Sequence, residues 1–219
     1  MLTQSEENYL KAIYNLSGAN KAIVSTNAVA EAINTKAASA TDMIQKLNKK
    51  GLVEYHKYQG VTPSSTGEKE ALNVIRKHRL WEVFLVQKLK FNWDEVHEVA
   101  EQLEHVDSPM LVEQLDIFLG RPKFDPHGDP IPNANGDMES SPTVTLSMLN
   151  PGDQCNVICA KDSSSEFLLY LDKIKISLGA AINVQDFFEY DGSYSVSVDD
   201  SPPITLSSKV AENIYIEKL

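Results

Sequence analysis

The stretch from residue 26 to residue 61 constrains the fold most, because two short helical patterns are followed by a hairpin pattern. A short helix is expected over residues 28–33, after hydroxyl side chains that can cap it. A second helix is expected from Lys36 to Lys50, where Gly51 ends it. Residues 52–61 alternate in polarity around a Gln-Gly turn, which predicts a β-hairpin. Two helices, a turn and a hairpin in this order predict a winged helix-turn-helix.

The second helix of this pattern presents a polar face that suits DNA. Its outward positions hold small hydroxyls, an amide and lysines, which match base edges and phosphates in a major groove. Lys57 lies near the predicted hairpin tip, where it can touch a backbone phosphate. The predicted DNA-binding residues are Lys36, Ser39, Thr41, Asp42, Gln45, Lys46 and Lys57. The alternative is an ordinary amphipathic helix with a solvated lysine face.

The charge of the chain is unevenly distributed. Its net charge of −11 argues at first against a nucleic-acid partner. Residues 1–80, however, contain 11 Lys and Arg against 7 Asp and Glu, whereas residues 81–219 contain 9 against 24. The N-terminal third is therefore basic, and a basic surface sets the local field that a phosphate backbone meets.

Two further helices flank the winged module. Thr3 and Glu6 have the spacing of a capping box, so a first helix is expected to begin there and to end at Gly18. A longer helix is expected from Thr66 to about Lys90. It carries more apolar surface than one helix of a small winged module needs, which predicts a subunit interface and a homodimer. The apolar residues are Leu72, Ile75, Leu80, Val83, Phe84 and Leu85.

Residues 97–105 form a helical pattern with two imidazoles and two carboxylates on one face. With about 3.6 residues per turn, these side chains project together. They are His97, Glu101, Glu104 and His105, and His78 and Glu82 precede them, again one turn apart. Nitrogen and oxygen ligands of this kind suit a divalent first-row metal. The alternatives are a solvated acidic face and a zinc-protease helix, but the latter needs a second histidine where Glu101 stands.

The C-terminal half changes to short alternating runs. Residues 120–142 are rich in Pro, Gly and Asn and are expected to form a linker, with His127 in a turn. Strands are expected at residues 154–160, 173–177, 182–187, 193–198, 203–206 and 214–217, with a short helix over residues 167–171. These elements predict a small β-barrel. Cys155 and Cys159 lack the spacing of a zinc knuckle and are expected to be reduced thiols of a strand.

Separated motifs follow one another in a recognisable order. They are Ser5-Glu6-Glu7-Asn8-Tyr9-Leu10-x-x-Ile13-Tyr14, Lys50-Gly51-Leu52-Val53, Arg76-Lys77-His78-Arg79-Leu80-x-Glu82, Val96-His97 with Glu104-His105-Val106, and Gly120-Arg121-Pro122 with Pro126-His127-Gly128-x-Pro130-Ile131-Pro132. In this order they resemble the diphtheria-toxin-repressor family of metal-dependent transcriptional regulators, which includes iron-sensing and manganese-sensing branches. The end of the chain resembles the SH3-like barrel, related to ferrous-transport accessory domains, of the longer family members.

The resemblance implies two metal sites. An ancillary site is matched by His78, Glu82 and His97, with Asp162 and Ser165 near the positions that the barrel lends to it. A primary site is matched by Glu101, Glu104 and His105, with Asn8 from the first helix. Iron-type members have a cysteine at the position of Glu101 and manganese-type members have a carboxylate. Because hard oxygen ligands favour Mn²⁺, the resemblance implies Mn²⁺, with Fe²⁺ as the alternative.

Two positions depart from the manganese-type pattern. Asn8 stands where these members have an aspartate, and Lys11 stands where they have a glutamate. An amide oxygen is a poorer ligand than a carboxylate and a lysine is none, so a binuclear site of that composition is not expected. Asn8 either ligates through its carbonyl oxygen or makes a local helix hydrogen bond.

The sequence thus predicts a mainly α protein with β structure in three parts. These are a winged helix-turn-helix domain over residues 1–72, a helical metal-binding and dimerisation domain with linker over residues 73–142, and an SH3-like domain over residues 143–219. The resemblance implies that the chain is a metal-dependent repressor of metal-ion uptake, and the two heads of its homodimer are expected to bind a palindromic DNA operator. Neither a membrane nor a small-molecule substrate is expected as a partner. The lack of a long apolar run and of a signal sequence predicts a cytoplasmic location.

Two other classes of protein are alternatives to this one. A di-metal carboxylate enzyme uses a Glu-x-x-His pattern on two helices, which neither Glu101 with His105 nor the reversed pair His78 and Glu82 reproduces. The other is a DNA-binding dimer whose polar helix only stabilises the fold. Salt-dependent duplex binding separates the enzyme from both regulators, and metal dependence of that binding separates the two regulators.

Overall fold

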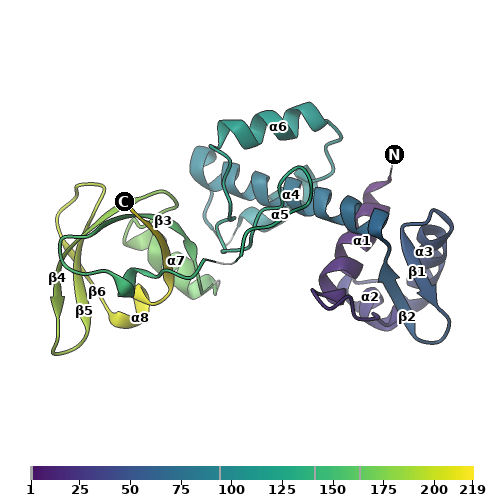
Figure 1. Cartoon of the computed structure of the whole chain (residues 1–219), viewed down its shortest axis with the longest axis horizontal. Coiled ribbons are helices and arrows are strands. Elements are labelled where there is room, and N and C mark those ends of the chain that lie inside the picture. The colour runs from purple at the N-terminus through teal and green to yellow at the C-terminus, as the bar shows by residue number, and fades with distance from the viewer. Residues whose placement is uncertain (1, 94, 141, 163) are drawn as a thin grey trace. The chain divides into compact units, whose positions relative to one another are not determined.

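The computed structural model describes all residues except 1, 94, 141 and 163 (Figure 1). The chain divides into two compact units. The first unit comprises Met1–Lys77, Glu104–Asp107 and Pro132–Asp137. The second comprises His78–Leu103, Ser108–Ile131 and Met138–Leu219. The division into three domains made from the sequence stays a prediction. No helix among the described residues combines the length and the apolar character needed to cross a bilayer.

The first unit contains the elements that the sequence predicts for a winged helix. They are α1 (Gln4–Ser17), α2 (Thr26–Ala32), α3 (Ala37–Lys49), β1 (Val53–His56), β2 (Gly60–Pro63) and the first part of α4 (Ser65–Leu89). The capping box is confirmed, since the Thr3 hydroxyl accepts the Glu6 amide and the Glu6 carboxylate accepts the Thr3 amide. Strands β1 and β2 pair antiparallel from Val53 and Pro63 to the turn.

Helix α3 packs one face into the core of this unit and leaves the other in solvent. Ala40, Ile44 and Leu47 are buried beside Leu10 and Ile13 of α1. The spacing of these buried residues is that of one helix face, so the polar positions between them are directed outward. The predicted winged helix-turn-helix is thereby confirmed in its order of elements and in its core.

The helices of the second unit begin with the second part of α4, followed by α5 (Val96–Leu103) and α6 (Pro109–Phe118). Helix α5 ends at Leu103 and not beyond His105, so Glu104 and His105 lie in the turn after it. The prediction of one helix face carrying all four polar residues is therefore wrong for these two. Ser108 caps the next helix by accepting the Leu111 amide, with Pro109 at the first helical position.

The apolar residues of α4 do not form the expected exposed face. Leu80 and Val83 are buried against Val112 and Leu115 of α6, and Leu85 is buried as well. One chain thus accounts for most of the apolar surface that the sequence analysis ascribed to a subunit interface. A different apolar face is exposed in this unit, at α6, where Met110 and Phe118 are 76% and 62% exposed.

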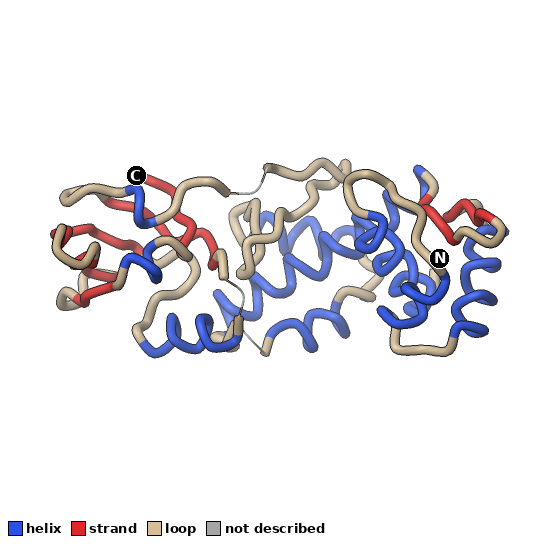
Figure 2. Tube along the Cα trace, turned by 90° about the horizontal axis from the view of Figure 1, so that it is seen from below, coloured by secondary structure: helices blue, strands red, loops and turns tan. Residues whose placement is uncertain are grey.

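The C-terminal part of the second unit is a five-stranded antiparallel sheet in the order β6-β5-β4-β3-β7. Figure 2 shows these strands together with short helices. The elements are the 3₁₀ helix η1 (Leu146–Met148), β3 (Gln154–Ala160), α7 (Ser165–Lys173), β4 (Ala181–Phe188), β5 (Ser193–Val198), β6 (Ile204–Leu206), α8 (Ser208–Ala211) and β7 (Ile214–Lys218). Register shifts in β3 and β4 mark bulges, which let a short sheet bend.

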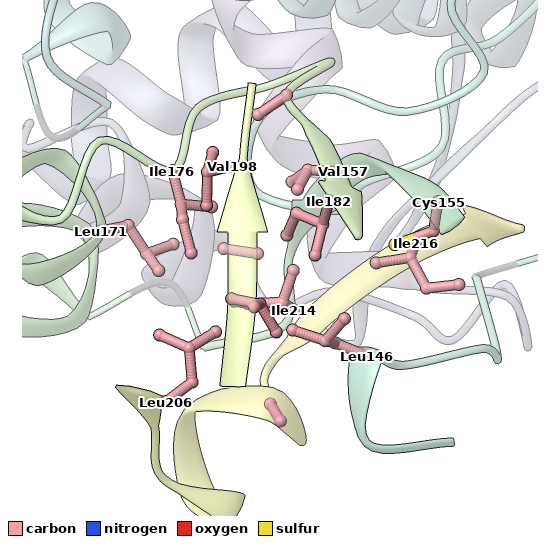
Figure 3. Packing of buried hydrophobic residues seen from close by; sticks show 14 of the residues in the cluster. Leu146, Cys155, Val157, Leu171, Ile176, Ile182, Val198, Leu206, Ile214 and Ile216 are labelled. Atoms are coloured by element: carbon pink, nitrogen blue, oxygen red, sulfur yellow. The ribbon is translucent and has the colours of Figure 1, made fainter. Parts of the chain in front are cut away.

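Buried aliphatic side chains hold this sheet together. Figure 3 shows Val157, Ile182 and Ile214 pointing into a common centre, which Leu171 of α7 and Leu206 of β6 also approach. Both cysteines are free and buried on β3, as predicted, and burial raises the pKa of the Cys155 thiol to about 11. The thiol is therefore protonated near neutral pH and is a poor nucleophile.

Two sequence-based expectations for this half are wrong. Residues 173–177 are not a strand but the end of α7 and the turn after it, where the Ile176 amide donates to the Leu171 carbonyl. Residues 120–142, of which residue 141 lies outside the described part, are not simply a linker. Phe124 and Pro130 form a bridge, and Asp125 and Ile131 are 2% and 5% exposed.

Candidate metal centre

Three ligand atoms from α4 and α5 meet in a tight triangle. Nε2 of His78 is 3.0 Å from Oε1 of Glu82 and 3.1 Å from Nδ1 of His97. That Nδ1 is 3.3 Å from the same Glu82 oxygen. Neighbouring ligands of an ion with bonds of about 2.1 Å are spaced about 3 Å apart. The three atoms therefore have the spacing of ligands that share one ion.

Hydrogen bonds cannot satisfy all three of these ligand atoms at once. One imidazole nitrogen offers either a proton or a lone pair, so Nε2 of His78 has a single site for both of its neighbours. A cation between the atoms accepts all three lone pairs at once. His78 and Glu82 are buried, whereas the His97 side chain is 62% exposed, which leaves a route from solvent.

The Glu82 carboxylate is the charged centre of this region. Burial alone raises the pKa of Glu82, but hydrogen bonds from His127, His78 and His97 outweigh it and lower the pKa well below the ordinary value. Glu82 is therefore ionised at neutral pH although it is 2% exposed. A buried carboxylate surrounded by imidazoles is a strong attractor for a divalent cation.

The second oxygen of Glu82 faces a group that the sequence analysis missed. Glu82, Asp125 and His127 each offer one ligand atom, and these atoms lie within 4.8 Å of one another. Nδ1 of His127 is 3.6 Å from Oε2 of Glu82, and Nε2 is 3.1 Å from the Trp93 carbonyl oxygen. A carbonyl only accepts, so Nε2 donates to Trp93, and because the pKa of His127 is raised, Nδ1 carries a proton as well, which faces the Glu82 carboxylate.

The loop that supplies Asp125 and His127 is fixed by its own contacts. Oδ1 of Asp125 accepts the amides of His127 and Asp129, both at 2.9 Å. Arg79 lies 3.5 Å from Asp125 and 3.6 Å from Asp129 and also donates to the Pro130 carbonyl. Gly128 has a φ of +89°, a region that favours glycine. The Asp-Pro-His order in a turn was the available signal in the sequence.

Charge in this second group is shared between neighbours. Burial and the Glu82 charge raise the pKa of Asp125 to about 7. Burial alone lowers the pKa of His127, but the Glu82 carboxylate outweighs burial and raises the pKa to about 9. Without an ion the group is thus held by protons on His127, and a metal that binds there has to displace them.

The donor set fits a divalent metal. His78, Glu82 and His97 supply two nitrogens and an oxygen, and Asp125 with His127 adds one of each on the far side of the same carboxylate. Mixed imidazole and carboxylate ligands suit Mn²⁺, Fe²⁺ and Zn²⁺, with the oxygens favouring the harder ions. Among the described residues, these two groups are the ones whose ligand atoms converge in this way.

The remaining predicted ligands do not join these groups. Glu101 lies on α5 with Oε1 3.5 Å from Nε2 of His97. Asp162 is half-buried and accepts the Ser164 amide, and Ser165 begins α7. The roles of Glu101 and Asp162 as ligands stay predictions.

Glu104, His105 and Asn8 lie in the first unit with two lysines. Nζ of Lys11 is 2.8 Å from both carboxylate oxygens of Glu104. Nδ1 of His105 is 2.5 Å from Glu7. Oδ1 of Asn8 is buried and makes no hydrogen bond to described protein atoms. An ammonium thus already covers the Glu104 carboxylate, and the roles of Glu104, His105 and Asn8 as metal ligands stay predictions.

The predicted DNA-binding residues lie on and around α3. Lys36, Ser39, Asp42, Gln45 and Lys46 are exposed on its outer face. The Thr41 hydroxyl instead donates to the Ala37 carbonyl within the helix. Lys57 is exposed in the turn between β1 and β2, and its ammonium lies 5.0 Å from the centre of the Tyr58 ring. Their contacts with DNA stay predictions.

A buried carboxylate anchors α3 to α1. Oε1 of Glu6 is 3.1 Å from Lys46 and 2.7 Å from Lys50. Burial raises the pKa of Glu6, but these lysines and the Thr3 amide outweigh it and lower the pKa to about 2 from 4.5. The Lys46 ammonium is thus directed toward the first helix as well as toward solvent.

The Glu6 network makes stability depend on pH in one direction. Since the pKa of Glu6 is lower in the folded state, its contribution is present above pH 4.5 and is lost as pH falls toward 2. We expect Glu6→Gln to lower the free energy of unfolding at neutral pH by roughly 1–3 kcal/mol, with a difference that shrinks toward pH 3. Urea denaturation measures this, and Glu68→Gln at an exposed pair is the control. A difference that stayed constant with pH would contradict it.

Comparisons with known proteins agree with this geometry. Residues 1–61 match the iron dependent repressor N-terminal DNA binding domain, residues 64–133 the iron dependent repressor metal binding and dimerisation domain, and residues 144–218 the FeoA domain. A solved manganese-dependent transcriptional repressor complex with manganese is 38% identical, with a TM-score of 0.62, over 98% of this chain and 100% of that chain.

Curated relatives include both metal branches. The HTH-type transcriptional regulator MntR of Oceanobacillus iheyensis is 35% identical over 105 residues, 48% of this chain and 70% of the relative. The iron-dependent repressor IdeR of Mycobacterium leprae is 30% identical over 132 residues, 60% of this chain and 56% of that relative. The residues matched by the two repressor family models include the winged helix, His78 and His97. The chain therefore belongs to the diphtheria-toxin-repressor family of metal-dependent, DNA-binding transcriptional repressors, which are regulators and not enzymes.

Proposed function

We propose that this chain represses genes for metal-ion uptake in the cytoplasm, with Mn²⁺ as the signal and Fe²⁺ as the alternative. The observation that carries the proposal is the triangle of His78, Glu82 and His97 at 3.0 to 3.3 Å. Bound there, the metal would supply positive charge to a buried carboxylate and tie α4 to α5. A solved relative at 38% identity is a manganese-dependent transcriptional repressor in complex with manganese, and the carboxylates of Glu82 and Asp125 favour the harder ion.

Response to metal follows from linkage between two binding events. Metal that binds the ordered form of the helices better than the disordered form shifts the population toward the ordered form. If only the ordered form places the α3 face correctly on DNA, metal and DNA raise each other's affinity by one common factor. Two heads of a homodimer would then read the two halves of a palindromic operator, about one helical turn apart.

The exposed apolar face of α6 supports a homodimer. Met110, Leu111, Ile117 and Phe118 are exposed there, and Leu89 at the end of α4 is exposed as well. Monomeric proteins rarely leave such residues together in water. A face of this kind on a domain of the dimerisation type is the surface we propose for the partner subunit.

A charged residue in this face is expected to separate the subunits. Phe118 is 62% exposed, so its ring is available to a partner. The centre of this ring lies 6.3 Å from that of Phe84. We expect Phe118→Glu to weaken dimerisation at least about 30-fold, equal to a hot-spot loss of about 2 kcal/mol. Sedimentation equilibrium measures the dissociation constant. Phe188→Glu, at an exposed phenylalanine of β4, serves as control, and an equal effect of both variants would argue against this face.

Metal removal tests the proposed function directly. Duplexes are first selected from a random-sequence pool with the full chain in MnCl₂, and binding is then followed by fluorescence anisotropy. Treatment with chelator is expected to weaken binding at least about 10-fold, within the range of coupling energies of allosteric proteins. MnCl₂ added afterwards is expected to restore it. Binding that is unchanged by chelator would reduce the protein to a winged-helix DNA binder.

A further inference from the structure

We propose that Lys11 is a built-in cation that takes the place of a metal in the first unit. In this inference, which rests on the proposed function, the Lys11 ammonium binds the Glu104 carboxylate and completes a charge cluster with Glu7, Lys77 and His105. The metal response of the chain then runs through His78, Glu82 and His97 alone. The observation behind it is the contact of one ammonium with both oxygens of a buried carboxylate.

The contact between Lys11 and Glu104 is close and shielded from water. Nζ of Lys11 lies 2.8 Å from each Glu104 oxygen, and the Glu104 side chain is 1% exposed against 16% for Lys11. The two residues are 93 positions apart in the sequence, so the contact is tertiary and not local. Charge pairs this well buried are screened little by solvent, and breaking one by removing a partner leaves an uncompensated charge.

The other charged groups of this cluster are also paired with groups of opposite charge or with an imidazole. Oε1 of Glu7 is 3.6 Å from Nζ of Lys77, which is buried, and Oε2 is 2.5 Å from Nδ1 of His105. Nε2 of His105 lies 3.7 Å from Glu104. Two carboxylates thus face two ammonium groups. The excess negative charge that attracts a divalent ion to Glu82 is absent here.

A divalent ion would have to compete with Lys11 for the same oxygens. It would lie within a few ångströms of the ammonium, and repulsion between like charges is strong where water is excluded. The buried Oδ1 of Asn8 without a hydrogen bond is one donor that an ion could use, but a single amide oxygen does not form a chelating set. A lysine at position 11 therefore replaces what an ion would do: it links α1 to the turn after α5.

The consequence is a division of labour between two charge clusters. The link from α1 to Glu104 is present at all metal concentrations, so the first unit is ordered before the metal arrives. Only the His78, Glu82 and His97 triangle responds to metal. Such a chain needs one kind of ion-binding event to become competent, where a protein with an ion in both places needs two.

Counting bound Mn²⁺ tests this inference. Equilibrium dialysis of the full chain, checked by the loss of the free Mn²⁺ electron paramagnetic resonance signal, gives ions per chain. The variant Lys11→Gln/Glu104→Gln removes both charges without leaving one unpaired. We expect it to bind as many ions as the wild type. Loss of one ion per chain in this variant overturns the inference. If the variant does not fold, His105→Gln decides in its place by the same criterion.

The reverse substitution gives a gain that a merely structural lysine would not produce. Lys11→Glu places a third carboxylate beside Glu7 and Glu104, and we expect it to bind one more Mn²⁺ per chain than the wild type. Lys21→Glu, which breaks the exposed pair of Lys21 and Glu68, makes the same change of charge and is expected to bind no additional ion. Lack of a gain in Lys11→Glu, or an equal gain in the control, overturns the inference. Glu82→Gln in the same assay tests the proposed function separately. In this variant we expect the loss of only the Mn²⁺ that His78, Glu82 and His97 bind.

Discussion

Glu82→Gln is expected to abolish metal-dependent DNA binding while leaving a folded protein. The substitution keeps the size of the side chain and removes the one charge that both ligand groups share. Oε1 faces His78 and His97, and Oε2 faces His127. Changing even an outer-shell partner of a metal lowers affinity by about 10- to 100-fold. Loss of a shared carboxylate is expected to lower Mn²⁺ affinity by at least about 100-fold.

The loss should appear in DNA binding through linkage. If metal raises DNA affinity by a given factor, a variant that no longer binds metal keeps only the metal-free affinity at every Mn²⁺ concentration. Fluorescence anisotropy with the selected duplex measures this, with a Mn²⁺ titration of each variant. Glu68→Gln on the same helix, at an exposed ion pair, makes the same chemical change away from the centre and should titrate like the wild type. A Glu82→Gln protein that still responded to Mn²⁺ would remove this centre from the switch.

The parts of the fold that depend on local sequence could be predicted. The capping box at Thr3, the helix ending before Gly51 and the hairpin around Gly60 each rest on neighbours in sequence, and the structure shows all three. His78 and Glu82 could be paired because one helical turn brings them together. Their distance to His97 depends on how α4 and α5 pack, which the periodicity of either helix leaves open.

Other features of the fold and of the site could not be predicted, mostly because long-range contacts determine them. Asp125 and His127 become candidate ligands because Arg79 and the Trp93 carbonyl hold a loop that composition alone marks as a linker. Residues 173–177 alternate like a strand, yet the Leu171 carbonyl accepts the Ile176 amide and turns the chain after α7. Likewise, Lys11 stands out in the sequence only as a departure from the manganese-type pattern, and only the tertiary structure joins it to Glu104. The positions of His127 and Lys11 are set by partners far away in sequence, whereas the turn after α7 is a local hydrogen bond that the alternation of residues 173–177 does not indicate.

Gly67→Ala is expected to destabilise the winged helix strongly, because the first turn of α4 lies directly against Leu52, the residue before β1. A Cβ on residue 67 would overlap the Leu52 carbonyl oxygen, which is part of the backbone and not a flexible side chain. The Ser64 amide holds that oxygen at 3.1 Å, and the Ser64 hydroxyl accepts the Gly67 amide at 3.1 Å and donates to the Gly51 carbonyl at 2.7 Å. The carbonyl therefore has no free direction in which to move, and the helix start has to shift away from the hairpin.

We expect this shift to cost about 3 kcal/mol or more in the free energy of unfolding, at the upper end for overpacked sites. For a unit of this size the melting temperature would fall by roughly 10–20 °C, followed by circular dichroism. Gly51→Ala is the matched control: its φ of +71° at the left-handed end of α3 disfavours alanine, but nothing lies within 4 Å of the added carbon. It should cost only about 1 kcal/mol, the strain of a left-handed residue. Equal losses in the two variants would mean that backbone strain and not the Leu52 carbonyl sets the requirement, and the close approach of α4 to the wing would then be unnecessary for stability.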